Sequence, residues 1–102
     1  YGTAHAQDSL RSYLDGARYL ALPEASREAY VMGLSDMSER MARAVGNEEE
    51  LAFLDRVRRC TSPMTATQLR VFVDDYVKSD PAHRSYGMAS NYRAAVFKLC
   101  PP

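Results

Sequence analysis

Two cysteines, Cys60 and Cys100, have the most distinctive chemistry in this chain. A cysteine pair can bind a metal, supply a nucleophile or form a disulfide. Metal sites draw on several converging His, Cys or carboxylate ligands, and a nucleophilic cysteine is activated by a nearby base. No histidine lies close to Cys60 in the sequence. Because an even, minimal cysteine count in a small protein favours one disulfide, we predict a Cys60–Cys100 bond.

The other residue types that often carry catalysis are sparse. His5 lies near the start of the chain and His83 in a polar segment after Pro81. Asp74 and Asp75 are adjacent, so on a helix their side chains point about 100° apart and do not face each other. The sequence contains no glycine-rich phosphate loop. We therefore expect a protein that is not an enzyme and binds no metal or cofactor.

Composition restricts the remaining classes of protein. The chain has 102 residues, of which 46% are hydrophobic and 25% charged, so we expect it to fold as a single domain. Its formal net charge of zero argues against nucleic acid as a partner, because such binders carry a basic excess. No apolar run approaches the roughly 20 residues that a membrane span needs.

The first residues indicate export. Ala4-His5-Ala6 has the small-x-small pattern that signal peptidases recognise, and Gln7 follows it. We interpret residues 1–7 as a signal-peptide remnant or a disordered tail, and residues 8–102 as a single helical domain. Disulfides persist in oxidising compartments, so the cysteine pair agrees with export. The expected location is the periplasm.

The hydrophobic pattern is helical along most of the chain. Asp8 or Ser9 is the expected cap of the first helix, and Asn47 and Thr65 each begin a capping box. The expected fold is all-α, a compact bundle of about five helices with one disulfide. The helices are predicted at about 9–20, 24–45, 48–59, 65–79 and 85–99.

Each predicted helix has an apolar face that we expect to point inward. In the middle of the second helix, Gly33 is expected to permit the close approach of another helix. The basic residues at the end of the third helix complement its dipole and are interpreted as a solvated face. The residues expected in the core are Leu10, Tyr13, Leu14, Ala17, Tyr19 or Leu20, Tyr30, Leu34, Met37, Met41, Val45, Leu69, Phe72, Val73, Tyr76, Val77, Met88, Tyr92, Ala95, Val96 and Leu99.

The segment 79–86 is the candidate partner-binding surface. It is polar and stiffened by proline, and arginine and tyrosine are common anchors of protein interfaces. The alternative is a simple connection between two helices. The residues predicted to bind a partner are Asp80, His83, Arg84 and Tyr86.

Residues 30–36 have the pattern Tyr-x-x-Gly-x-x-Asp, and in residues 60–63 a cysteine is followed by a proline three positions later. These motifs resemble the Tyr-x-x-Gly-x-x-Asp helix and, with one extra residue, the Cys-x-Pro turn of the Rap/Tai-type immunity proteins, which protect bacteria against type VI secretion amidase toxins. Residues 76–81 resemble the end of the helix that follows this turn in the family. Residues 94–100 resemble the family's final stretch, which ends in the last cysteine. Two features depart from the family pattern: the first half of the chain lacks extra cysteines, and the proline expected before the last cysteine follows it.

The resemblance implies a small helical, exported protein, often a homodimer, that binds and blocks a peptidoglycan-cleaving amidase in the periplasm. Inhibition of this kind requires a rigid surface and no catalysis. Two alternatives remain open from the sequence: a small periplasmic stress chaperone with one disulfide, and an orphan secreted scaffold domain that only associates with itself.

Overall fold

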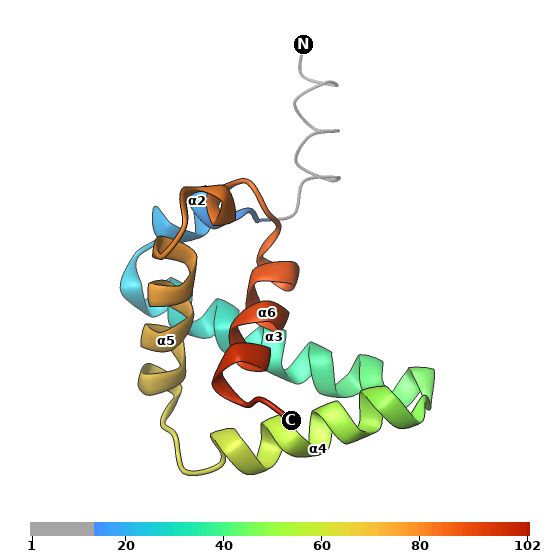
Figure 1. Cartoon of the computed structure of the whole chain (residues 1–102). Helices are drawn as coiled ribbons and strands as arrows, with labels where there is room; N and C mark the ends of the chain where they lie inside the picture. The colour runs from blue at the N-terminus through green and yellow to red at the C-terminus, as the bar shows by residue number, and fades with distance from the viewer. Residues whose placement is uncertain (1–13) are drawn as a thin grey trace.

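The computed structural model describes residues 14–102, which contain five α-helices and one 3-10 helix (Figure 1). The expected tail at residues 1–7 lies outside the described residues, as do Leu10 and Tyr13. The all-α fold with one disulfide is confirmed. The elements are α2 (Gly16–Leu20), α3 (Glu24–Val45), α4 (Glu48–Thr61), α5 (Ala66–Lys78), the 3-10 helix η1 (Pro81–Arg84) and α6 (Met88–Leu99).

Local sequence signals set most of the helix ends. Thr65 and Gln68 form the predicted capping box, with side-chain to backbone hydrogen bonds of 3.0 and 2.9 Å. Asn47 caps α4 by accepting from the backbone N–H of Glu49 at 2.8 Å. Gly46 ends α3 with a φ of 66°, in the left-handed region that glycine adopts without a steric penalty.

Three boundaries differ from the prediction. α2, the first helix of the described residues, begins at Gly16 because the Asp15 carboxylate accepts from the backbone N–H of Arg18 at 2.8 Å and caps it there. Within the described residues, the expected helix over 9–20 is therefore limited to its last turn. α4 continues to Thr61, and the last helix starts at Met88, after η1.

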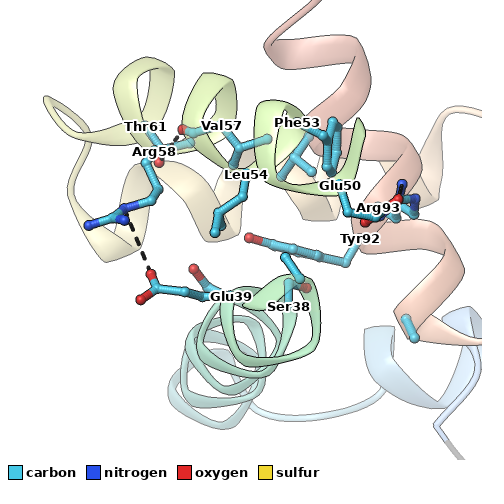
Figure 2. A pocket seen from close by; sticks show the side chains of 14 residues that line it. Ser38, Glu39, Glu50, Phe53, Leu54, Val57, Arg58, Thr61, Tyr92 and Arg93 are labelled. Carbon is cyan, nitrogen blue, oxygen red and sulfur yellow. Dashed lines mark hydrogen bonds and ion pairs between the residues drawn. The ribbon is translucent and has the colours of Figure 1, made fainter. Parts of the chain in front are cut away.

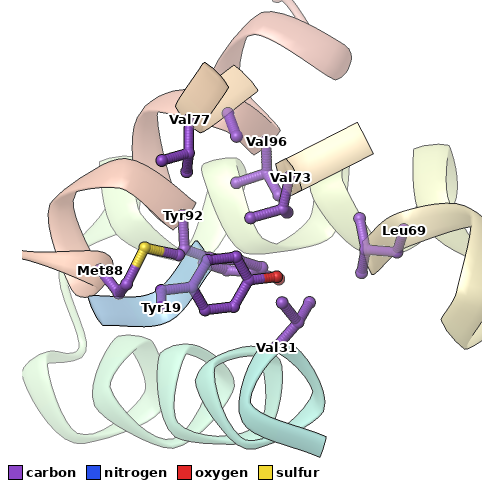
Figure 3. Packing of buried hydrophobic residues seen from close by; sticks show 9 residues of the cluster. Tyr19, Val31, Leu69, Val73, Val77, Met88, Tyr92 and Val96 are labelled. Atoms are coloured by element: carbon purple, nitrogen blue, oxygen red, sulfur yellow. The ribbon is translucent and has the colours of Figure 1, made fainter. Parts of the chain in front are cut away.

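The helices pack around one apolar cluster. Figure 3 shows the Tyr19 ring of α2 in the space between Val31 of α3 and Met88 of α6. All three side chains are fully buried. The cluster consists of Tyr19, Val31, Leu69, Val73, Val77, Met88, Tyr92, Ala95 and Val96.

Part of the predicted core on α3 is wrong. Met37, Met41 and Val45 are 57%, 55% and 59% exposed. The reason is the length of α3: it pairs with α4, and the end of this pair near Gly46 extends beyond α5 and α6 (Figure 1). The prediction for Gly33 is also wrong, since a Cβ at that position would meet no atom within 4 Å.

The predicted disulfide is present between Cys60 and Cys100, whose Cα atoms are 5.8 Å apart. It joins the last turn of α4 to the residue that ends α6. Next to it, the guanidinium of Arg56 donates to the backbone carbonyl of Cys100 at 2.8 Å. Two independent contacts therefore hold the C-terminal end of α6 against α4.

A buried ionic cluster connects α2, α3 and α5. The carboxylate of Asp74 accepts from the Tyr19 hydroxyl at 2.7 Å, from Arg70 at 2.9 Å and from Arg27 at 3.3 Å. Asp74 is 3% and Arg70 6% exposed, whereas Asp75 is exposed. The two adjacent acids therefore point apart, as predicted. Buried charges are tolerated when they are paired in this way.

Candidate interaction site

The four predicted partner-binding residues lie in the segment 79–86, which we call the η1 loop because η1 forms its centre. At its start, the Asp80 carboxylate accepts from the backbone N–H of Ala82 at 2.9 Å. Pro81 occupies the first turn, where its missing N–H leaves no bond unmade. Asp80 therefore acts within the chain as the cap of η1.

His83 is also held by the protein itself. Its Nδ1–H donates to the backbone carbonyl of Tyr76 at 2.8 Å, and the two rings stack with centroids 4.3 Å apart and planes 12° apart. The Tyr86 ring lies 6.2 Å from the imidazole, tilted by 43°. The stacked rings of Tyr76 and His83 thus connect the last turn of α5 to the η1 loop.

The buried side chain of Asn91 holds the η1 loop in place. Its side chain is 1% exposed, and its amide donates to the backbone carbonyls of His83 at 2.9 Å and Tyr86 at 3.2 Å. Backbone carbonyls of a connecting segment usually face water. Here two of them are fixed by a buried side chain of α6, which determines the path of the loop.

Gly16 supports the loop from α2. Its backbone N–H donates to the Tyr86 carbonyl at 3.0 Å. A Cβ at this position would lie 2.4 Å from the His83 carbonyl oxygen and 2.9 Å from the Arg84 Cα. Real Cβ atoms do not approach other atoms so closely, so only glycine lets α2 pack against the loop. The prediction from sequence did not include this residue.

Arg84 and Tyr86 project from this fixed backbone. Both are exposed, Tyr86 to 53%. Arg84 forms no ion pair with any residue in the range 14–102. Tyrosine and arginine supply much of the binding energy at protein interfaces. A backbone already held in place lowers the entropic cost of binding.

The four residues thus divide into two kinds. Asp80 and His83 shape the η1 loop, while Arg84 and Tyr86 remain accessible to another molecule. The sequence alone could have indicated a role for Asn91. It lies three residues after Met88 on the inward face of α6, where a polar side chain needs a hydrogen-bond partner. Its acceptors, however, could not be named without the path of the loop.

Three further findings concern metal binding, membrane spans and related proteins. Among residues 14–102, no group of three or more His, Cys, Asp or Glu side chains is placed to hold a metal ion. None of the described helices has both the length and the apolar character needed to cross a membrane. Comparisons with protein families, with curated proteins and with solved structures each found no match for this chain.

Proposed function

We propose that this protein is an exported inhibitor that binds another protein through the η1 loop. The proposal rests on one observation: the backbone of the loop is held in place by hydrogen bonds, while two of its side chains are exposed. Asn91 and Gly16 fix the loop, and Arg84 and Tyr86 point outward from it. A rigid projection of this kind suits insertion into the cleft of a partner, because little conformational freedom is lost on binding.

The partner class that we propose is a peptidoglycan-cleaving amidase of a type VI secretion system. This part of the proposal draws on the motifs at residues 30–36, 60–63, 76–81 and 94–100, which resemble Rap/Tai-type immunity proteins. The Cys60–Cys100 bond supports a periplasmic location, where such amidases act and where disulfides persist. An immunity protein blocks its toxin by occupying the active-site cleft and needs no catalytic group of its own.

The proposal is tested by affinity capture. The protein, with its disulfide intact, is used to capture partners from the periplasmic fraction of its source organism, and mass spectrometry identifies them. We expect one stoichiometric partner whose amidase activity on peptidoglycan fragments falls when the complex forms. Capture of a stoichiometric partner that has no amidase activity would contradict the partner class and leave the binding role in place.

A second candidate function is favoured by the exposed apolar row on α3. Met37, Met41 and Val45 follow one another at four-residue steps and are each more than half exposed. Exposed apolar patches occur at interaction surfaces, including homodimer interfaces and the client-binding surfaces of chaperones. A small stress chaperone would suppress the aggregation of an unrelated unfolded protein, which an immunity protein should not do. A light-scattering assay with such a client separates the two functions.

A further inference from the structure

A pocket lies between α3, α4 and α6 (Figure 2), and none of the residues that line it belongs to the η1 loop. Its volume is about 140 Å³. Its lining is mixed: apolar side chains, which include Leu54 and Val57 of α4 and Val96 of α6, alternate with polar and charged ones. Protein interiors are close-packed and leave few voids larger than a water molecule. A pocket of this volume is therefore a place where a small molecule would gain many contacts.

The Tyr92 hydroxyl is one of several polar groups that line the pocket. Figure 2 shows the Tyr92 ring extending from α6 with its hydroxyl directed between Leu54 of α4 and Ser38 of α3. Tyr92 is 3% exposed. Burial raises the pKa of its phenol, and a hydrogen bond with Ser35 lowers it in part. A phenol with the ordinary pKa of 10.0 is already neutral at pH 7, and the upward shift keeps it so, so the hydroxyl can donate a hydrogen bond.

The charges around the pocket compensate one another. On one side Glu39 and Arg58 form an ion pair at 3.8 Å. On the other side both carboxylate oxygens of Glu50 accept from the guanidinium of Arg93. The first ion pair joins α3 to α4, and the second joins α6 to α4. Because each pair is neutral overall, no net charge remains beside the apolar side chains. A charged ligand would lose its hydration here without gaining an unpaired counter-charge, so the pocket favours a neutral ligand.

We propose that the pocket binds a small neutral ring compound with one hydroxyl or carbonyl group, which bonds to the Tyr92 hydroxyl while the ring contacts Ala42, Leu54 and Val57. The size follows from the volume, since an apolar cavity of about 150 Å³ accommodates benzene. Phenol and cyclohexanol represent this class of about seven non-hydrogen atoms. The inference is independent of the function proposed for the η1 loop.

The test is an NMR titration of the full chain with phenol, with benzene as the ligand lacking the polar group and benzoate as the charged ligand. We expect phenol to give saturable shifts at Leu54, Val57 and Val96, benzene to bind more weakly, and benzoate to give no saturable shifts at these residues. Absence of saturable shifts with phenol, shifts centred on the η1 loop, or equal binding of benzoate would overturn the proposal.

Two variants sharpen the test. Tyr92→Phe removes only the hydroxyl and should weaken phenol binding at least threefold while leaving benzene binding unchanged. Ala42→Leu fills the pocket and should abolish the binding of both ligands. Ala89→Leu offers a second filling variant at an exposed lining position, in case Ala42→Leu does not give a folded spectrum. A folded filling variant that binds phenol like the original protein would also overturn the proposal.

Discussion

The side-chain amide of Asn91 lies 2.9 Å from the backbone carbonyl oxygen of His83 and donates to it from inside the protein. Through this bond the first turns of α6 hold the loop that precedes them. The same amide reaches the carbonyl of Tyr86. The position of the two exposed side chains, Arg84 and Tyr86, thus depends on a residue that no partner would touch.

Replacing Asn91 should therefore loosen the η1 loop. Asn91→Leu keeps the branching and the number of non-hydrogen atoms of the side chain but removes both hydrogen bonds, and we expect it to lower the free energy of unfolding by about 1–3 kcal/mol. Amide hydrogen exchange should become faster from His83 to Tyr86. Urea unfolding and exchange measurements check this, with the exposed neighbour Ser90→Ala as the control. Unchanged exchange in the loop would show that Asn91 does not determine its order.

Replacing each of two glycines with alanine should change the free energy of unfolding in opposite directions. Gly16→Ala places a Cβ against the His83 carbonyl, so we expect a loss of about 1–3 kcal/mol in the free energy of unfolding. Gly33→Ala meets open space in the middle of α3 and should stabilise the protein by about 0.5–1 kcal/mol. Urea denaturation of both variants gives the comparison. A neutral Gly16→Ala would mean that α2 can move away from the loop at no cost.

The disulfide should contribute a large part of the stability. It closes a segment of 40 residues, and the chain-entropy model assigns about 4 kcal/mol to a loop of this length. Reduction should then lower the melting temperature by roughly 10 °C or more. Thermal unfolding with and without reductant measures this, and the double variant Cys60→Ser with Cys100→Ser should match the reduced protein. Equal melting temperatures for oxidised and reduced protein would refute the estimate.

Tyr19 should make stability sensitive to alkaline pH. Burial, followed by the hydrogen bond to Asp74, raises the pKa of Tyr19 far above its ordinary value of 10.0. The unfolded chain therefore releases this proton at a lower pH than the folded protein does. The resulting stabilisation is complete below pH 10 and is lost as the pH rises further, by about 1.4 kcal/mol per pH unit for one proton.

Tyr19→Phe tests both parts of this account. At pH 7 it should cost about 1.5–3 kcal/mol, because a hydrogen bond to an ionised acceptor is lost. Between pH 10 and 11 the free energy of unfolding should also fall less steeply for Tyr19→Phe than for the original protein. The difference between the two slopes should correspond to about one proton. Tyr30→Phe is the control, since the Tyr30 hydroxyl makes no hydrogen bond within the described chain. An alkaline slope that is the same in Tyr19→Phe and the original protein would exclude Tyr19 as its source.

Much of the fold could be predicted because its signals are local. The capping box at Thr65, the glycine at residue 46 and the apolar spacing of α5 each depend on residues within a few positions of one another. The exposure of Met37 and Met41 could not be predicted in this way. Periodicity identifies an apolar face, but the lengths of the neighbouring helices decide how much of that face is covered.

The site was predictable only in part for a similar reason. Residue type singled out Arg84 and Tyr86, and both are exposed. The roles of Gly16 and Asn91 depend on contacts between segments far apart in sequence, which only the packed structure brings together. The ionic cluster around Asp74 was missed because Tyr19 lies 55 positions away from it.

The most direct measurement of the central claim is the dissociation constant of the captured partner for three proteins: the original, Arg84→Ala with Tyr86→Ala, and a control. The control, Arg59→Ala with Phe97→Ala, also removes an exposed arginine and a half-exposed aromatic ring, away from the η1 loop. We predict that the loop variant binds at least tenfold more weakly, with an unchanged melting temperature, and that the control binds like the original protein. Equal affinity of the loop variant and the original protein would contradict the assignment of the η1 loop as the binding surface.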